Sequence, residues 1–178
     1  MTDYNNLTRF LIDFIQEQQA KLGYMKEKIR LYYPLGSLNH MLGTSCDVGE
    51  MTRLLKCLPK EMTDVLGDIR VSNIHQRFCL EIPEQGSEYV HEHTDEASFI
   101  YALVDLMRNH GTTKEQVLSL FEKTGREVEY KQMNNDEFDF YVRFLHDEND
   151  CYFYCFKEEG KHLTYHRFMP ADYVEFDF

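Results

Sequence analysis

Residues 138–168 read FDFYVRFLHDENDCYFYCFKEEGKHLTYHRF, and the pattern of this stretch decides the fold class. Apolar and polar side chains alternate in three short runs, which is the period of strands that bury one face. Turn-forming residues cluster between the runs, at 146–150 and 157–160. The alternation already begins at Val128 and Tyr130. An antiparallel β-meander is therefore predicted from residue 128 onward.

The chain before the meander carries mainly helical patterns. Apolar residues recur at helical spacing, with capping residues or terminal glycines nearby, over residues 7–22, 35–42, 47–58, 94–107 and 112–121. The predicted N-caps and capping boxes are Asn5 or Asn6 for the first helix, Asp47 with Glu50, and Thr112 or Thr113 with Glu115 or Gln116. Two alternating stretches, 29–33 and 69–82, predict short extended segments, and residues 83–87 are expected to form a loop.

The order of these patterns favours an α+β fold over a parallel α/β fold, because the helices precede the meander in a block. We expect N-terminal and central helices packed on a C-terminal antiparallel β-meander. No linker, repeat or low-complexity tract interrupts the pattern, so residues 1–178 are predicted to form a single domain.

Composition narrows the classes of partner. The chain has 178 residues, 43% of them hydrophobic, which is enough to build a core. Its 31 acidic and 19 basic residues give a net charge of −12, so its field repels phosphate backbones and anionic lipids. Neither nucleic acid nor a membrane is expected as a partner. Five cysteines without a Cys-x-x-Cys pair, and an N-terminus without a leader, predict a cytoplasmic protein with reduced thiols.

One histidine cluster could carry metal chemistry. If residues 91–95 are extended, His91, His93 and Asp95 point the same way, and two imidazoles with a carboxylate can hold a divalent transition metal. Such a metal could activate water for hydrolysis, with Glu92 or Glu96 as a general base. A simpler explanation is that Thr94 caps a helix whose first turn contains Asp95, in which case the histidines need no function.

A second candidate is the outward face of the predicted meander. If the strand registers align, this face gathers aromatic and hydrogen-bonding side chains of kinds that are favoured at contact surfaces. Its predicted members are Tyr141, Arg143, Tyr152, Tyr154, His162, Thr164 and His166. Cross-strand pairs of these residue types also stabilise a sheet that binds nothing.

The sequence contains no recognisable motif for nucleophilic catalysis or for phosphate binding. No serine has the Gly-x-Ser-x-Gly setting, no cysteine stands in a recognised catalytic pattern, and no glycine-rich phosphate loop is present. Tyr24, Tyr32 and Tyr33 interleave with Lys26, Lys28 and Arg30 in the one locally basic stretch. On a chain of this net charge, we expect that stretch to pair with acidic residues.

Two segments, residues 32–40 (YYPLGSLNH) and 159–168 (EGKHLTYHRF), resemble a bacterial family of domains of unknown function. The resemblance covers most of the chain and implies a stand-alone cytoplasmic protein. It supplies no activity, cofactor or catalytic residue.

Three functional hypotheses follow. The first is a non-enzymatic binding or regulatory module that needs no cofactor and takes a protein or a small ligand on the outward sheet face. The second is a metal-dependent hydrolase that uses His91, His93 and Asp95. The third is an acidic immunity- or antitoxin-like protein that neutralises a basic partner, and net charge is its one argument.

Overall fold

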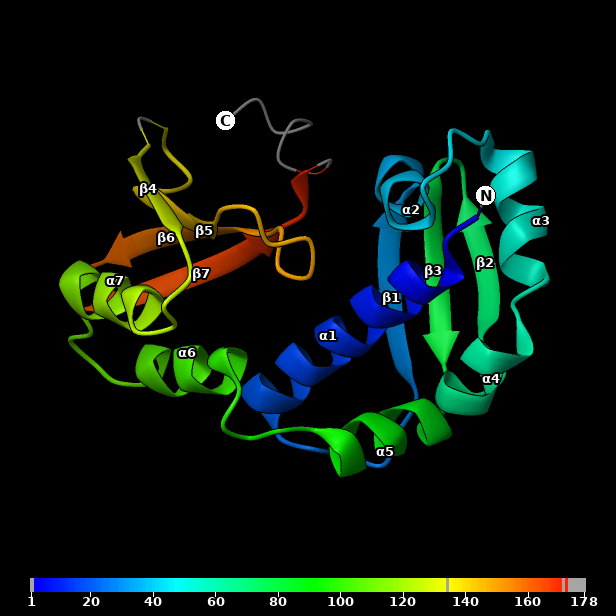
Figure 1. The fold of residues 1–178 in the computed structure, drawn as a ribbon, viewed down its shortest axis with the longest axis horizontal. Helices are drawn as coiled ribbons and strands as arrows, with labels where there is room; N and C mark the ends of the chain where they lie inside the picture. The colour runs from blue at the N-terminus through cyan, green and yellow to red at the C-terminus, as the bar shows by residue number, and fades with distance from the viewer. Residues whose placement is uncertain (1, 134, 171, 173–178) are drawn as a thin grey trace. The chain divides into compact units, whose positions relative to one another are not determined.

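Both sheets of the computed structural model are antiparallel, and the model describes residues 2–133, 135–170 and 172 (Figure 1). Contacts divide the chain into two compact units, Met1–Glu96 and Ala97–Phe178. Each unit combines helices with its own sheet, so the predicted α+β class is confirmed. The single domain over residues 1–178 stays a prediction.

The N-terminal unit packs helices against a three-stranded sheet. The sheet has the order β1-β3-β2, and all its neighbours are antiparallel. Its described elements are α1 (Tyr4–Leu22), β1 (Ile29–Pro34), α2 (Leu35–Leu42), α3 (Val48–Lys56), α4 (Lys60–Leu66), β2 (Arg70–Ile74), β3 (Arg77–Ile82) and α5 (Glu84–His93).

Capping residues set the limits of these helices. Asp3, and not the expected Asn5 or Asn6, caps α1, because its Oδ1 accepts the N–H of Asn6 at 2.9 Å. The predicted capping box at α3 is confirmed: Asp47 accepts from the N–H of Glu50, whose carboxylate accepts the N–H of Asp47.

One face of the three-stranded sheet is buried under helices. Helix α2 packs against β1, α3 against β2 and α5 against β3. The apolar residues of this face are almost completely buried: Leu31, Tyr33, Phe78, Leu80 and Ile82. Strand alternation leaves the residues between them on the opposite face.

The loop expected at residues 83–87 is wrong, because α5 begins there. Pro83 is the N-cap of α5, and proline is well suited to a helix start because an N–H in the first turn has no intrahelical partner. Gly86 lies against the backbone of Leu66 and the side chain of Ile82, so its small size allows close packing. The turn-like composition of this segment therefore reflects a helix start and a close approach.

The C-terminal unit is a helical hairpin followed by the meander. Strand order β4-β5-β6-β7 follows chain order, so the predicted meander is confirmed. The N-cap position of α6 is occupied by Ser98 and not by Thr94, and of the capping-box pairs predicted for α7 the structure has Thr113 with Gln116. The described elements are α6 (Phe99–Met107), α7 (Lys114–Glu122), β4 (Val128–Gln132), β5 (Phe140–Phe144), β6 (Phe153–Glu159) and β7 (His162–Phe168).

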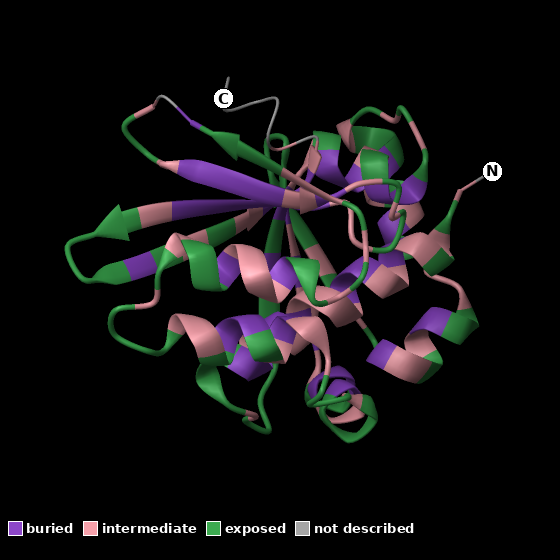
Figure 2. Cartoon of the chain, turned by 60° about the vertical axis from the view of Figure 1, so that its left-hand side comes forward, coloured by how far each residue is buried: buried purple, intermediate pink, exposed green. Residues whose placement is uncertain are grey.

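Aromatic side chains fill the core of this unit. The ring of Phe121 from α7 lies 5.0 Å from that of Phe144 and 5.2 Å from that of Tyr154. Phe140 stacks on Phe156 across the strand pair β5-β6 at 4.9 Å. The two central strands are buried over much of their length, and exposed residues gather at the turns (Figure 2).

Candidate functional site

The predicted metal cluster lies on a helix, not on an extended segment. His91 and His93 belong to α5, and Asp95 follows its end. Side chains two positions apart on a helix project about 200° apart around its axis, so the two imidazoles point to different sides. Thr94 ends α5, and its hydroxyl donates to the carbonyl oxygen of Val90 at 2.6 Å. The extended geometry expected of this cluster is therefore wrong.

Each of these histidines already has an aromatic neighbour. His91 stacks on Tyr24 with ring centroids 4.0 Å apart, and His93 stacks on Tyr89 at the same distance. Within residues 2–133, 135–170 and 172, no three His, Cys, Asp or Glu side chains are arranged to hold a metal ion. The metal-dependent hydrolase stays a prediction that this geometry does not strengthen.

The predicted ligand face of the meander is divided between two faces of the sheet. Tyr154 pairs with Val142 and points toward the aromatic core, so its assignment to the outward face is wrong. The reason is that Phe153–Phe156 are all buried, and no alternation marks the core side. The predicted residues that the register does place on one face are Tyr141, Arg143, His162, Thr164 and His166.

Tyr141 and Arg143 on this face are held by Glu129. The Tyr141 hydroxyl and the Arg143 Nε both donate to Glu129 Oε2, at 2.9 Å and 2.6 Å. The hydrogen bond from Arg143 lowers the pKa of Glu129, and the bond from Tyr141 acts in the same direction. Tyr141 is also buried in an apolar cluster with Phe153. A ligand role for this face stays a prediction.

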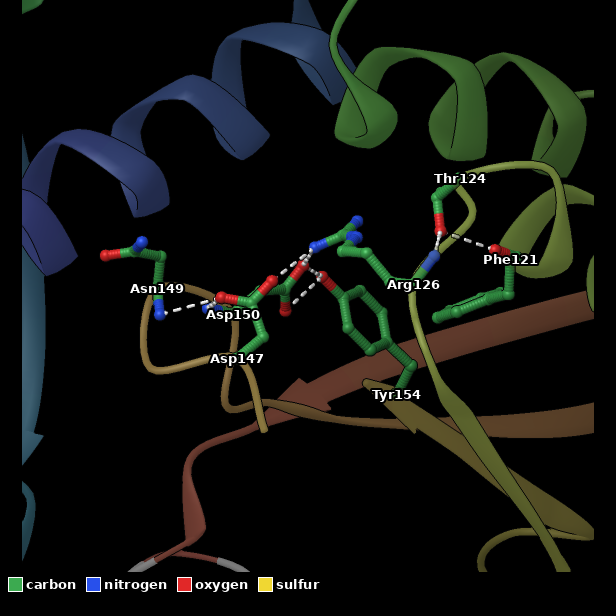
Figure 3. A network of polar contacts seen from close by, with 7 residues as sticks. All are labelled: Phe121, Thr124, Arg126, Asp147, Asn149, Asp150 and Tyr154. Atoms are coloured by element: carbon green, nitrogen blue, oxygen red, sulfur yellow. Dashed lines mark hydrogen bonds and ion pairs between the residues drawn. The ribbon is translucent and has the colours of Figure 1, made fainter. Parts of the chain in front are cut away.

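A polar network in the C-terminal unit centres on Arg126 (Figure 3). Its Nη1 donates to Asp147 Oδ2 at 3.0 Å and to Asp150 Oδ2 at 3.2 Å, and its guanidinium lies 3.3 Å from the ring centroid of Phe144. Asp150 also accepts the Tyr154 hydroxyl at 3.0 Å, which explains how this tyrosine can be buried. These contacts hold the β5–β6 loop against the segment just before β4, and we call the network the Arg126 clasp.

The exposed face of the three-stranded sheet has a different character, and we call it the basic face. Cross-strand pairs align its members: Arg30 with Glu81 and Tyr32 with Cys79 on one side, and Arg70 with Glu81 on the other. Its residues are Lys28, Arg30, Tyr32, Arg70, Ser72, Ile74, Arg77, Cys79 and Glu81. Four of them are basic and one is acidic, on a chain whose net charge is −12.

Glu81 neutralises one end of the basic face. Its carboxylate lies 2.8 Å from Arg30 Nε, 3.2 Å from Lys28 Nζ and 3.9 Å from Arg70 Nη1. Hydrogen bonds from Arg30 and Lys28 lower the pKa of Glu81, so it is ionised at neutral pH. Asp68 adds a further acidic group near this end. The cationic character is therefore strongest at the opposite end.

That opposite end pairs a cation with exposed apolar side chains. The guanidinium of Arg77 lies 5.8 Å from the ring centroid of Tyr32, and Arg77 has no ion pair with any residue that the structure describes. Tyr32 is 54% exposed and Ile74, opposite Arg77 in the register, is 78% exposed. Large apolar side chains beside an unneutralised cation suit a ligand that is both anionic and apolar.

The basic face is hollowed. Its open hollow of about 690 Å³ is lined by basic-face residues from all three strands, a volume within the usual range of ligand sites. All five consecutive residues of β2, Arg70–Ile74, line it. Since alternate strand residues point to opposite faces, the hollow must border the β2 backbone as well as its side chains.

The sequence contained only part of this signal. Residues 24–33 stood out as basic and aromatic, and the prediction that they pair with acidic residues is confirmed for Arg30 with Glu81 and Lys26 with Glu88. Arg70 and Arg77 lie far along the chain and join the face through strand pairing. A pattern read along one segment cannot supply that pairing.

The chain matches a known protein family. Residues 4–176 match the model of a domain of unknown function described from an E. rectale gene, DUF3877. The chain belongs to this family. DUF3877 is bacterial in its described source, so the resemblance to a bacterial family of unknown function is confirmed. No curated protein and no solved structure matches this DUF3877 chain. None of its described helices is both long and apolar enough to cross a bilayer.

Proposed function

We propose that this protein is a non-enzymatic binding module, and that its basic face holds an acidic segment of a partner protein. The observation that carries the proposal is the juxtaposition of Arg77 and Arg70 with exposed Tyr32 and Ile74 around one hollow. Charge complementarity favours acidic ligands. The exposed apolar side chains favour a ligand that also carries apolar groups for them to contact.

A protein segment fits better than a nucleic acid. A polyanion extends beyond the basic face and would meet the acidic surplus of the chain, whose net charge is −12. A short peptide segment presents only a few carboxylates and can stay within the face. Side chains that contact Ile74 and Tyr32 are also available in a peptide.

The proposal includes a cytoplasmic location and a regulatory role through partner binding. All five cysteines are free thiols, as expected in a reducing compartment. Cell fractionation with an antibody against the native chain tests this: recovery in the soluble cytoplasmic fraction supports the location, and recovery elsewhere contradicts it.

The binding test uses an array of immobilised twelve-residue peptides of defined net charge. We expect the protein to bind acidic peptides that contain aliphatic residues, and the binding to weaken as NaCl rises. The double variant Arg70→Gln, Arg77→Gln should weaken binding by about tenfold or more, since charged contacts of this kind contribute one to several kcal/mol. The charge-matched control is Arg53→Gln with Lys123→Gln, at exposed positions in α3 and just after α7.

Two outcomes contradict the proposal. If the array prefers basic peptides, the acidic immunity- or antitoxin-like alternative gains support instead. If acidic peptides bind equally well to both double variants, the ligand site lies elsewhere. In that case His166→Ala tests the outward face of the meander, which contains Tyr141, Arg143 and His162.

A further inference from the structure

The free edge of β2 adds a second recognition element to the basic face. In the sheet order β1-β3-β2, β2 pairs with β3 on one side only. Within the described part of the chain, no loop or helix backbone is hydrogen-bonded to residues 70–74. Ser72, Asn73 and Ile74 are all exposed, although they alternate between the two faces. An edge of this kind presents unpaired N–H and C=O groups.

The hairpin register identifies which backbone groups are unpaired. Ile74 and Arg77 flank the two-residue turn between β2 and β3 and face each other. In an antiparallel hairpin with such a turn, the flanking residues form a hydrogen-bonded pair, and bonded pairs then alternate along the ladder. The N–H and C=O groups of Val71 and Asn73 therefore point away from β3.

Strand β2 lacks most of the features that usually prevent an edge strand from pairing with another chain. Natural edges are blocked by proline, by charged residues along their length, or by a covering loop. β2 contains no proline, and its one charged residue, Arg70, stands at its first position. By contrast, β1 ends in Pro34. Helix α3 packs against β2, but no backbone group of the described residues outside the sheet is hydrogen-bonded to the edge of β2, which lies beside the hollow that its residues line.

We propose that the acidic partner segment is extended and adds to the free edge of β2 as a fourth strand. The inference rests on the proposed function, because the basic face supplies the preference for acid. Val71 and Asn73 would donate and accept the backbone hydrogen bonds. Strand addition gives affinity through the main chain and specificity through alternate side chains.

The two sides of the added strand meet different surroundings. Side chains on the basic face lie beside Arg70 and Ile74 of β2. Side chains on the other side lie toward a smaller hollow of about 330 Å³, which is lined by the aliphatic residues Leu55, Leu58, Ile69 and Val71 and by the polar residues Lys56, Thr63 and Asp68. The recognised segment is therefore one in which acidic residues alternate with aliphatic ones over about five positions, the length of β2.

Charge complementarity decides between this occupant and a second copy of the chain. Two antiparallel copies of β2 would place one Arg70 near each Ile74, and the second copy would add no carboxylate beyond the Glu81 that each Arg70 already has at 3.9 Å. The net charge of −12 also opposes self-association. An acidic segment from another protein would instead bring carboxylates to Arg77, which has no ion pair with any described residue, and to the weakly paired Arg70.

The test measures fluorescence anisotropy with a labelled eight-residue peptide of alternating Glu and Val. A second peptide has the same sequence and charge but carries N-methyl groups on every other residue, which removes the N–H donors of one edge. We expect the peptide whose N-methyl groups face β2 to bind at least tenfold more weakly than the unmethylated peptide. Two N-methylated peptides are measured, one methylated at the Glu residues and one at the Val residues. Only one of these two N-methyl frames blocks the peptide edge that would pair with β2.

The protein variant Asn73→Pro gives the complementary test. Its proline removes an N–H that points away from β3, so the hairpin can be kept, and circular dichroism confirms that the variant folds. We expect at least a fivefold loss of affinity for the Glu-Val peptide. The control Gln76→Ala changes an exposed side chain of the adjacent β2–β3 turn, outside the residues that line the hollow, and should leave affinity within twofold.

The outcomes separate the two proposals. If the Glu-Val peptide binds and both N-methyl frames bind as tightly, strand addition is wrong while the acidic-ligand function stands. If no acidic peptide binds, the proposed function itself fails. If sedimentation shows a concentration-dependent dimer that Asn73→Pro abolishes and no peptide competes with it, the occupant is a second copy and the inference is overturned.

Discussion

At the scale of single residues, the Arg126 clasp shows how one guanidinium stabilises two carboxylates, one of which also accepts a hydrogen bond from a buried tyrosine. Burial of Asp147 opposes its charged form, but the hydrogen bonds from Arg126 and from the backbone N–H of Asn149 outweigh that cost. The pKa of Asp147 is therefore lowered. A carboxyl with a lowered folded-state pKa stabilises the fold above its unfolded pKa of about 4, and this contribution is lost as pH falls through the folded pKa.

Asp147→Asn tests this directly. We expect the variant to lose about 1 kcal/mol of unfolding free energy at pH 7, because a partly buried, charge-assisted hydrogen bond is weakened. Urea unfolding at pH 7 and pH 3 measures it, and the difference between wild type and variant should shrink at pH 3. The control Asp105→Asn, at an exposed pair with Arg108, should stay within about 0.5 kcal/mol. An undiminished gap at pH 3 would assign the loss to packing.

At the scale of secondary-structure elements, α5 packs closely against α4 and β3 because residue 86 is a glycine and has no Cβ atom. A Cβ at Gly86 would lie 2.5 Å from Ile82 Cγ2 and 2.7 Å from the carbonyl oxygen of Leu66. The first contact is with a side chain that can shift, whereas the second is with backbone. Gly86 is therefore required by packing, although glycine within a helix is intrinsically unfavourable.

Gly86→Ala and Gly49→Ala form a matched pair. The first should destabilise the protein by about 1–3 kcal/mol, because the packed helix must move. The second adds a methyl group in α3 whose nearest neighbour, Asp47 Oδ1, is 3.4 Å away, so it should be neutral or stabilise by up to about 1 kcal/mol. Thermal melting followed by circular dichroism compares them. Equal melting temperatures would show that the α5 contact is not tight in solution.

Sequence prediction succeeded for the elements whose position is set by a single local sequence pattern. Capping boxes at Asp47 and Thr113 mark the starts of α3 and α7, and alternation marks the meander. It failed at α5, where a proline start and the packing of Gly86 resemble a loop. It also failed for the direction of Tyr154, because the β6 segment is buried on both faces.

The candidate site was harder to predict than the elements. Arg30 and Tyr32 were visible in one segment, but the basic face exists only because β1 and the β2-β3 hairpin share a register. The free edge of β2 is likewise a property of strand order and not of any residue. Sites assembled across strands need the pairing, which depends on the packing of the whole unit.

At the scale of the whole molecule, the question is whether the two compact units unfold together. Each has its own sheet and its own buried apolar residues. Small units bury a smaller fraction of their surface than larger ones, so each alone is less stable than the combined chain. The DUF3877 model covers residues 4–176 and thus both units. These two observations favour one cooperative structure, as the single-domain prediction requires.

Differential scanning calorimetry of the full chain tests this prediction. We expect one transition whose calorimetric and van't Hoff enthalpies agree, which is the signature of two-state unfolding. The unit-specific variants supply the control: Gly86→Ala in the N-terminal unit and Asp147→Asn in the C-terminal unit should each move that single transition as a whole. Two transitions, of which each variant lowers only its own, would instead show two domains. The basic face would then belong to a domain that can be tested for binding by itself.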